Sequence, residues 1–205
     1  MARDKSPIVK QSRREGYALH RKAHKVMAHK TGVPGQHGNG RQSKPSLYAT
    51  QLREKQKVRR IYGVLEKQFR RIMAEAFKEQ GMTGSKMLEL LERRLDNAVY
   101  RAGFAVSRRQ ARQLVTHGHF LLNGRRVDIP SIRLKPGDVV EVRDHSKNTV
   151  FFKNLAEVSR DSQTQPVGWM RSDVSKMKFE VTGIPAREDA EPGIKEQLIV
   201  EFYSR

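Results

Sequence analysis

The clearest structural signal in this chain is the run Ser107-Arg108-Arg109-Gln110-Ala111-Arg112-Gln113-Leu114-Val115, with the run Phe120-Leu121-Leu122-Asn123-Gly124-Arg125-Arg126-Val127 shortly after it. A serine followed three residues later by glutamine is a helix-capping pattern. Apolar residues three and four positions apart then give that helix one buried face. Asn-Gly accepts the positive φ angles of a tight hairpin turn. The two runs predict a helix that begins at Ser107 and ends at Gly118, followed by a hairpin with arginines at its tip.

Further elements are predicted on both sides of these runs. Apolar residues recur at three- and four-residue steps over residues 85–102, which predicts one helix capped by Ser85 and ended by Gly103. After the hairpin, Pro136-Gly137-Asp138 predicts a turn and residues 139–142 a further strand. The order helix, helix, hairpin, strand predicts a small α+β unit.

Basic side chains on this unit are candidates for binding RNA. Positive groups near a helix N-terminus, where free backbone N–H groups also point outward, suit a polyanion. A solvated arginine face is the alternative for one helix taken alone, but the hairpin arginines and the charge of the whole chain favour the polyanion. The candidates are Arg93, Arg94, Arg101, Arg108, Arg109, Arg112, Asn123, Arg125 and Arg126.

Three runs of the unit resemble the small RNA-binding module named after small-subunit ribosomal protein four. They are Leu91–Asn97, Ser107–Val115 and Leu122-Asn123-Gly124. The module also occurs appended to some RNA-modifying enzymes and to an aminoacyl-tRNA synthetase. The rest of the chain must therefore decide the function.

Composition points to a nucleic-acid partner. The 205 residues leave room for one large domain or two small ones, and 41 Lys and Arg against 22 Asp and Glu give a net charge of +19. Such an excess repels itself unless a polyanion neutralises it, and an anionic membrane surface is the alternative to nucleic acid. We find no transmembrane run and no signal peptide, and cysteine is absent, which removes disulfides, thiolate catalysis and cysteine-ligated zinc. A cytoplasmic protein is the simplest expectation.

The basic arm, residues 1–45, carries eleven Lys and Arg against two acidic residues. Its apolar residues are scattered and glycines crowd residues 32–40, so we expect it to lack a core and to become ordered against a partner. His20 and His24 are four apart, but the neighbouring cations and the lack of nearby carboxylates favour RNA contact over a metal site. No metal or cofactor is predicted. The arm's RNA-binding candidates are Arg13, Arg14, His37 and Lys44.

Residues 46–86 predict two basic helices. The first begins after Pro45-Ser46, and Gly63 breaks the pattern before an apolar face that continues to Ala76. Between residues 46 and 86, 10 basic residues stand against 4 acidic ones, so ion pairs between them do not account for most of the charge. The RNA-binding candidates here are Arg53, Lys55, Lys57, Arg59 and Arg60.

The C-terminal part is less regular. The apolar patterns of residues 150–152 and 174–179 predict strands. Trp169 is expected to be a core or lid aromatic, and a platform on which an RNA base stacks is the lesser alternative. From Glu180 the net charge is −3. The spacing of Ile194, Leu198 and Phe202 favours a closing helix that packs on residues 46–80. Apolar residues also alternate in this segment, so a strand is the alternative. Glu188, Asp189, Glu191 and Glu196 are expected to stay in solvent. The predicted protein-interface residues are Glu188, Asp189, Glu196 and Glu201.

Further runs resemble the bacterial-type family of small-subunit ribosomal protein four over nearly the whole chain. They are Arg13–Gly16, Pro34–Gly38, Gln51–Gly63 and Leu198–Arg205. The resemblance implies a primary binder of small-subunit (16S-type) rRNA at a multi-helix junction that nucleates 5′-domain assembly. It also implies a contact with small-subunit protein five that bears on decoding accuracy, and a place where mRNA enters the subunit. Some members hold zinc with four cysteines in the arm, and this chain departs from that pattern.

The resemblance further implies a helical domain into which the RNA-binding module is inserted. We therefore expect an α+β protein with a basic arm (1–45), a helical domain (46–86) completed by an acidic segment (180–205), and an inserted module with following strands (87–179). A structural, non-enzymatic ribosomal protein is expected. A messenger-binding translational repressor and a module-only RNA-binding protein remain alternatives. An RNA-modifying enzyme is disfavoured, because the chain has no Gly-rich phosphate loop, no paired-acid pattern and no room for a catalytic domain.

Overall fold

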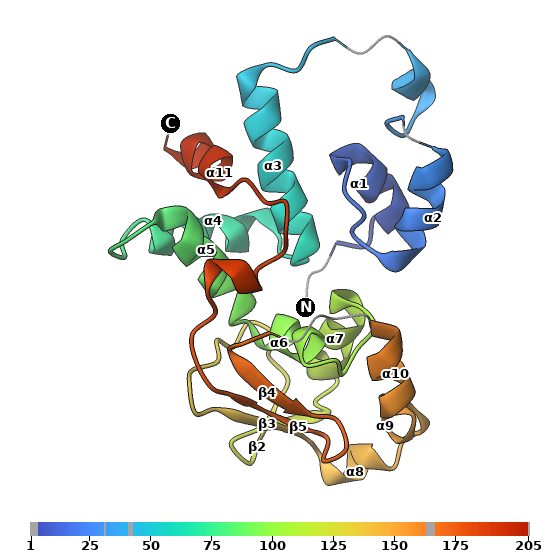
Figure 1. The fold of residues 1–205 in the computed structure, drawn as a ribbon, viewed down its shortest axis with the longest axis vertical. Coiled ribbons are helices and arrows are strands. Elements are labelled where there is room, and N and C mark those ends of the chain that lie inside the picture. Colours follow the sequence, from blue (N-terminus) through green and yellow to red (C-terminus); the bar gives the residue numbers. More distant parts are fainter. Residues whose placement is uncertain (1–3, 31, 41–42, 163–166, 205) are drawn as a thin grey trace. The chain divides into compact units, whose positions relative to one another are not determined.

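The computed structural model describes residues 4–30, 32–40, 43–162 and 167–204. The chain forms two compact units (Figure 1). Residues 1–84 and 193–205 form the first unit, and residues 85–192 form the second. The sequence predicted the return to the helical domain at residue 180, whereas residues 180–192 belong to the second unit and the return begins at Gly193.

The basic arm of the first unit contains two short α-helices, α1 (Ile8–Glu15) and α2 (Arg21–His29), and the 3-10 helix η1 (Gln36–Asn39). Gly16, with φ 63°, ends α1. The Nδ1 atom of His20 accepts a hydrogen bond of 3.1 Å from the Lys22 backbone N–H and so caps α2. Helices α1 and α2 pack together, and α1 also packs on α3 (Leu47–Ile61). The expectation that the arm lacks packing of its own was therefore wrong, whereas its ordering against a partner stays a prediction.

Three further helices complete the first unit. The Ser46 hydroxyl accepts from the Ala49 N–H and begins α3, as predicted, and Gly63, with φ 63°, separates it from α4 (Glu66–Ala76). The tail forms α11 (Glu196–Tyr203), which packs along α3 (Figure 1). The helical alternative for the tail is thus confirmed. Phe202 contacts Tyr48 with ring centroids 5.6 Å apart.

The second unit begins with α5 (Thr83–Glu92) and α6 (Leu95–Arg101). The prediction of one unbroken helix capped by Ser85 was wrong, because α5 starts before that residue and the chain is extended at Arg94, with φ −65° and ψ 137°. Arg94 forms a bridge with Arg133, and the Leu134 N–H donates to the Arg93 carbonyl at 2.9 Å. This strand-like segment replaces the helical hydrogen bonds that the apolar spacing had predicted.

The next elements follow the prediction. Ser107 caps α7 (Arg108–Thr116) by accepting from the Gln110 N–H, although the Gln110 side chain accepts from Val106 rather than from Ser107. Asn123 and Gly124, at φ 49° and 77°, form the turn of the hairpin. Its strands are β1 (Phe120–Leu122) and β2 (Arg125–Val127), and β3 (Val139–Val142) follows.

The later strand predictions were wrong for residues 150–152 and 174–177, whereas residues 178 and 179 do lie in a strand. Residues 150–152 lie in α9 (Val150–Lys153), between α8 (Asp144–Lys147) and α10 (Leu155–Ser162). Residues 174–177 form the turn between β4 (Met170–Asp173) and β5 (Lys178–Val181), where Met177 has φ 52°. Val150 is exposed while Phe152 is buried, so this apolar run has only one buried side. The antiparallel sheet has the order β2-β1-β3-β5-β4.

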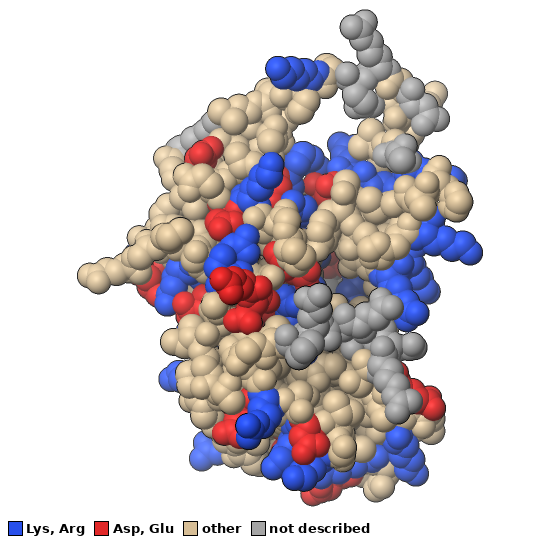
Figure 2. All heavy atoms as spheres, in the orientation of Figure 1, with Lys and Arg blue, Asp and Glu red and all other residues tan. Residues whose placement is uncertain are grey.

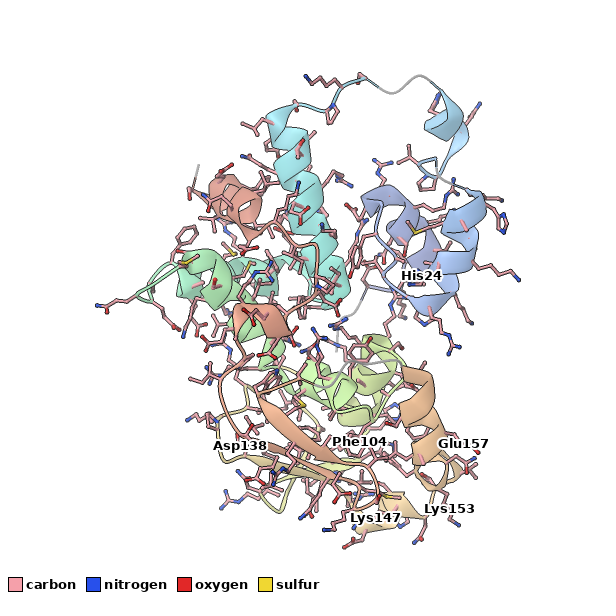
Figure 3. The ribbon with its side chains drawn as sticks, viewed as in Figure 1. His24, Phe104, Asp138, Lys147, Lys153 and Glu157 are labelled. Atoms are coloured by element: carbon pink, nitrogen blue, oxygen red, sulfur yellow. The ribbon has the colours of Figure 1, made fainter. Side chains whose placement is uncertain are left out.

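The core of the second unit lies between α6, α7 and the sheet. Figure 3 places Phe104 in this layer, where its ring meets Phe179 at 5.7 Å and Phe120 edge-on at 6.3 Å. Trp169 is 2% exposed in the same core, so its ring cannot serve as a stacking platform. The 3-10 helix η2 (Arg187–Asp189) follows the sheet. None of the helices in the described ranges combines the length and apolarity needed to cross a bilayer.

Candidate nucleic-acid interface

The predicted RNA-binding arginines of the second unit fall into two groups. Arg109 on α7 and Arg125 and Arg126 on β2 are exposed. Five others form ion pairs with carboxylates of the same unit: Arg93, Arg94, Arg101, Arg108 and Arg112. The two groups therefore differ in exposure, because Arg109, Arg125 and Arg126 face solvent whereas the other five are partly or fully buried beside their carboxylates.

Asp96 is one centre of these pairs. Arg94 donates to it through Nε at 3.0 Å and NH2 at 2.8 Å, in a fork that matches both carboxylate oxygens. Arg112, one turn into α7, donates to Asp96 Oδ2 at 3.0 Å. Arg93 separately donates to Glu89 at 2.9 Å and to the Leu134 carbonyl at 2.9 Å. These contacts hold the break between α5 and α6 and tie α7 to it.

Glu92 and Glu191 form the second centre. Arg101 donates to Glu92 at 3.1 and 2.9 Å, and Asn97 also donates to Glu92. Arg108 donates through Nε to Asn97 at 2.8 Å and through NH2 to Glu191 at 2.7 Å. We call these residues together the arginine network: Glu92, Arg94, Asp96, Asn97, Arg101, Arg108, Arg112 and Glu191.

The contacts of the arginine network differ from those that the sequence predicted for its residues. Glu191 was predicted to stay in solvent, and that prediction was wrong, because its side chain is only 16% exposed against Arg108. Four arginines of the network face three carboxylates, so most of their charge is balanced before any RNA arrives. RNA binding by these arginines stays a prediction. Their contribution to the fold is visible in the contacts.

The hairpin places its side chains differently. Asn123 donates to Asp138 Oδ1 at 2.9 Å and accepts from the Val139 N–H at 2.9 Å, so its side chain locks the turn to β3 (Asp138 is labelled in Figure 3). The Arg126 guanidinium lies over Gly118, where an added Cβ would come within 2.7 Å of Nε. Arg125 and Arg126 thus lie on a rigid turn, which lowers the entropy lost when they bind a phosphate.

The cations of α3 are also engaged with acids. Lys55 is buried and donates to Glu66 at 2.9 Å, with its Nζ 4.8 Å from the centre of the Phe202 ring. Lys57 pairs with Glu54 at 2.7 Å, and Arg59 lies 3.8 Å from Glu66. Arg53 and Arg60 both pair with Glu15 of α1. These five predicted binders therefore also hold the first unit together.

The arm presents a more open basic surface. Arg13 donates to the Gly32 carbonyl at 2.7 Å and so fixes a loop, but Arg14, His37 and Lys44 are exposed. Figure 2 shows Lys and Arg side chains gathered over α1 and α2, and Figure 3 shows His24 projecting from α2. Exposed cations that the prediction omitted lie here: Arg21, Lys22 and Lys25. A helical pattern over residues 21–29 would have placed these three cations on a helix surface.

Burial shifts the pKa values of Glu15 and His119. Burial raises the pKa of Glu15 above 4.5, although the nearby arginines, Arg53 first, act in the opposite direction. Burial, followed by His117 and Arg143, lowers the pKa of His119 below 6.5. His119 Nδ1 lies 3.0 Å from the Ser146 hydroxyl, and its ring lies 5.6 Å from that of Phe152. His119 is therefore mainly neutral at pH 7 and adds little to the basic surface.

Comparison with known proteins identifies the family. The family description "Ribosomal protein S4/S9 N-terminal domain" matches residues 3–92, and "S4 domain" matches residues 93–140. The chain is 51% identical over 206 residues to small ribosomal subunit protein uS4 of Roseiflexus castenholzii. It is 49% and 51% identical over 211 residues to the proteins of that name from Thermus thermophilus and Clostridioides difficile. Each match covers 100% of both chains. The chain therefore belongs to the family of small ribosomal subunit protein uS4.

Proposed function

We propose that this chain is a structural, non-enzymatic constituent of the small ribosomal subunit that binds small-subunit rRNA and nucleates assembly of its 5′ domain. The observation that carries the proposal is the full-length match to proteins named small ribosomal subunit protein uS4. The exposed cations of the arm, of α7 and of β2 support it, because a net charge of +19 needs a polyanion nearby.

Phosphate neutralisation supplies most of the binding free energy in this proposal. The exposed arm cations and the hairpin arginines are the side chains best placed to meet phosphates. Recognition is then mainly of RNA shape, because an RNA duplex hides its base edges in a deep, narrow major groove. If about 6–10 phosphates are contacted, affinity falls roughly 10³–10⁵-fold between about 50 and 200 mM salt.

The test compares three RNAs of similar length: a 5′-domain fragment of 16S-type rRNA, a tRNA and a leader messenger. The proposal expects the rRNA fragment to bind tightest, with the steep salt dependence given above. Preference for the leader messenger would favour the translational-repressor alternative. A flat salt dependence on the rRNA fragment would contradict phosphate neutralisation as the main source of affinity.

We further propose that the acidic tail contacts a basic neighbour, small-subunit protein five, near the place where mRNA enters the subunit. The net charge of −3 from Glu180 onward supports this, since RNA phosphate repels it. Glu188 is exposed, and Glu196 is partly exposed. Two other candidates are more engaged within the chain, because Asp189 accepts from two backbone N–H groups and Glu201 accepts from Gln51.

A further inference from the structure

The carboxylate of Glu191 occupies one donor edge of the Arg108 guanidinium. Glu191 Oε1 lies 2.7 Å from Arg108 NH2 and 3.6 Å from Arg101 NH2. The side chains of Arg108 and Glu191 are each 16% exposed, so the pair lies at the edge of the solvent. Arginine binds carboxylate and phosphate oxygens with the same donor geometry. A phosphate that reaches this edge therefore competes with Glu191 for the same N–H groups.

Arg101 and Arg108 each make contacts besides those with Glu191. Arg101 already makes two hydrogen bonds to Glu92. Arg108 already donates to Asn97, and its guanidinium carbon lies 4.6 Å from the centre of the Tyr100 ring. Both guanidinium groups are thus oriented by neighbours on α5 and α6. The additional effect of Glu191 is a negative charge at a site that would otherwise attract an anion.

Glu191 also lies on an anchored segment that leads out of the second unit. Asp189 accepts from the Ala186 N–H at 2.8 Å and from the Gly168 N–H at 3.2 Å, and Ala190 is buried. Two residues after Glu191, the chain passes to the first unit at Gly193. The pair of Arg108 with Glu191 joins this segment to α7 shortly before that passage.

We propose that Glu191 is an internal substitute for an RNA phosphate, and that phosphate binding at Arg108 displaces it and releases residues 190–192 from α7. The proposal rests on the RNA-binding function given above. By thermodynamic linkage, the contact that holds the segment must weaken anion binding, and anion binding must weaken the hold on the segment. The same ion pair thus sets both the affinity of this site and the freedom of the chain between the two units.

Binding of inorganic polyphosphate to the full chain provides the first test, because this probe offers phosphate charge without bases. Glu191→Gln should tighten binding by roughly 2–5-fold, the range that a partly exposed ion pair represents. Glu157→Gln, an exposed glutamate of the same unit, makes the same change in net charge and should have a smaller effect. In an Arg108→Gln background, Glu191→Gln should lose its advantage over that control.

Hydrogen exchange provides the second test. Polyphosphate should speed amide exchange in residues 186–192 of the unmodified chain, and Glu191→Gln should speed it without polyphosphate. Glu191→Asp keeps the charge on a side chain that is one methylene shorter, so it should change polyphosphate binding and amide exchange less than Glu191→Gln does. If circular dichroism shows that Glu191→Gln does not fold, Glu191→Asp takes its place in both tests.

The outcomes are separable. If Glu191→Gln binds polyphosphate no better than Glu157→Gln, or more weakly, Glu191 is a structural partner of Arg108 and the proposal is wrong. Unchanged exchange in residues 186–192 on polyphosphate binding would overturn it as well. If the chain binds polyphosphate as expected but does not prefer the 5′-domain rRNA fragment, the proposed function fails while this inference stands.

Discussion

Glu15 lies against Arg53, with Oε1 3.1 Å from NH1 and with none of the Glu15 side chain exposed. Arg60 pairs with the same carboxylate oxygen. Glu15 is the last residue of α1 and Arg53 lies in the middle of α3, so the pair attaches the basic arm to the helical part of the first unit. The Lys57 ammonium, 5.8 Å from the centre of the Tyr17 ring, lies close to the same attachment. Contacts within the chain itself therefore attach the arm to α3.

Glu15→Gln should loosen the arm. Burial of the charge, which raises the Glu15 pKa, favours the neutral side chain, but the substitution leaves Arg53 and Arg60 without their carboxylate, and this loss dominates at a net cost of about 1–3 kcal/mol. Trypsin should then cleave within residues 1–45 roughly tenfold faster, since about 1.4 kcal/mol corresponds to a factor of 10. Glu157→Gln is the control for net charge. Unaltered cleavage would mean that other contacts hold α1 on α3.

Glu66→Gln should make the chain less sensitive to acid. Burial is the largest single influence and raises the pKa of Glu66, but the hydrogen bonds from Lys55 and Tyr203 and the charges of Lys55 and Arg59 together outweigh it, and the pKa lies below 4.5. A lowered pKa stabilises the fold above pH 4.5, and that stabilisation is lost as the pH falls through the folded-state pKa. The difference in Tm between wild type and Glu66→Gln should be largest near neutral pH and shrink below pH 4.5. A constant difference would contradict the assignment.

The exposed arginines should be separable from the arginine network. Replacing Arg109, Arg125 and Arg126 with Gln should weaken rRNA binding and reduce the salt slope by up to about 0.9 for each lost phosphate contact. Stability should change by less than about 0.5 kcal/mol per site, as is usual for surface positions.

Arg112→Glu should instead lower Tm, because it brings a second carboxylate to Asp96, which Arg112 now contacts at 3.0 Å. Arg108→Glu should do the same beside Glu191. For exposed arginines the simpler expectation is that such reversals abolish specific binding in a folded protein, but the ion pairs make loss of stability the first effect. Thermal unfolding of both variants checks this, and unchanged Tm values would restore the simpler expectation.

Deleting residues 1–40 should weaken RNA binding but preserve the preference for junction RNA over random RNA. The deletion removes the exposed charge of the arm and also Glu15, the partner of Arg53 and Arg60, whereas the hairpin and α7 keep their placement in the second unit. Filter binding of both RNAs to the full and shortened chains measures the two effects. Loss of discrimination with retained affinity would assign shape recognition to the arm.

Glu196→Lys should leave rRNA binding nearly intact but raise misreading in a reporter assay, if the tail contacts a basic neighbour whose binding favours one of two subunit conformations. Its side chain lies so close to Gly84 that a Cβ on that glycine would come within 2.6 Å of it. Glu157→Lys, at an exposed glutamate outside the tail, makes the same change in net charge and is the matched control. Lost rRNA affinity with normal accuracy would place the tail in the RNA site.

The sequence by itself determined the elements that depend on neighbouring residues. The Ser107 cap, the Asn123-Gly124 turn and the start of α3 at Ser46 were all predicted and are all present. Each depends on side-chain hydrogen bonds or φ preferences that act within about three or four residues along the chain. The excess of positive charge followed directly from the composition.

Only the tertiary structure decided how those charges are used. Arg108 and Glu191 are 83 residues apart and Arg53 and Glu15 are 38 apart, so no local pattern could pair them. The break at Arg94 likewise depends on the distant residue Arg133, which supplies a bridge that apolar periodicity cannot anticipate. Helical spacing reports which side of a segment is apolar, whereas ion pairing depends on which segments the fold brings together. The arginines that look alike in sequence therefore divide into those that hold the fold and those that face solvent.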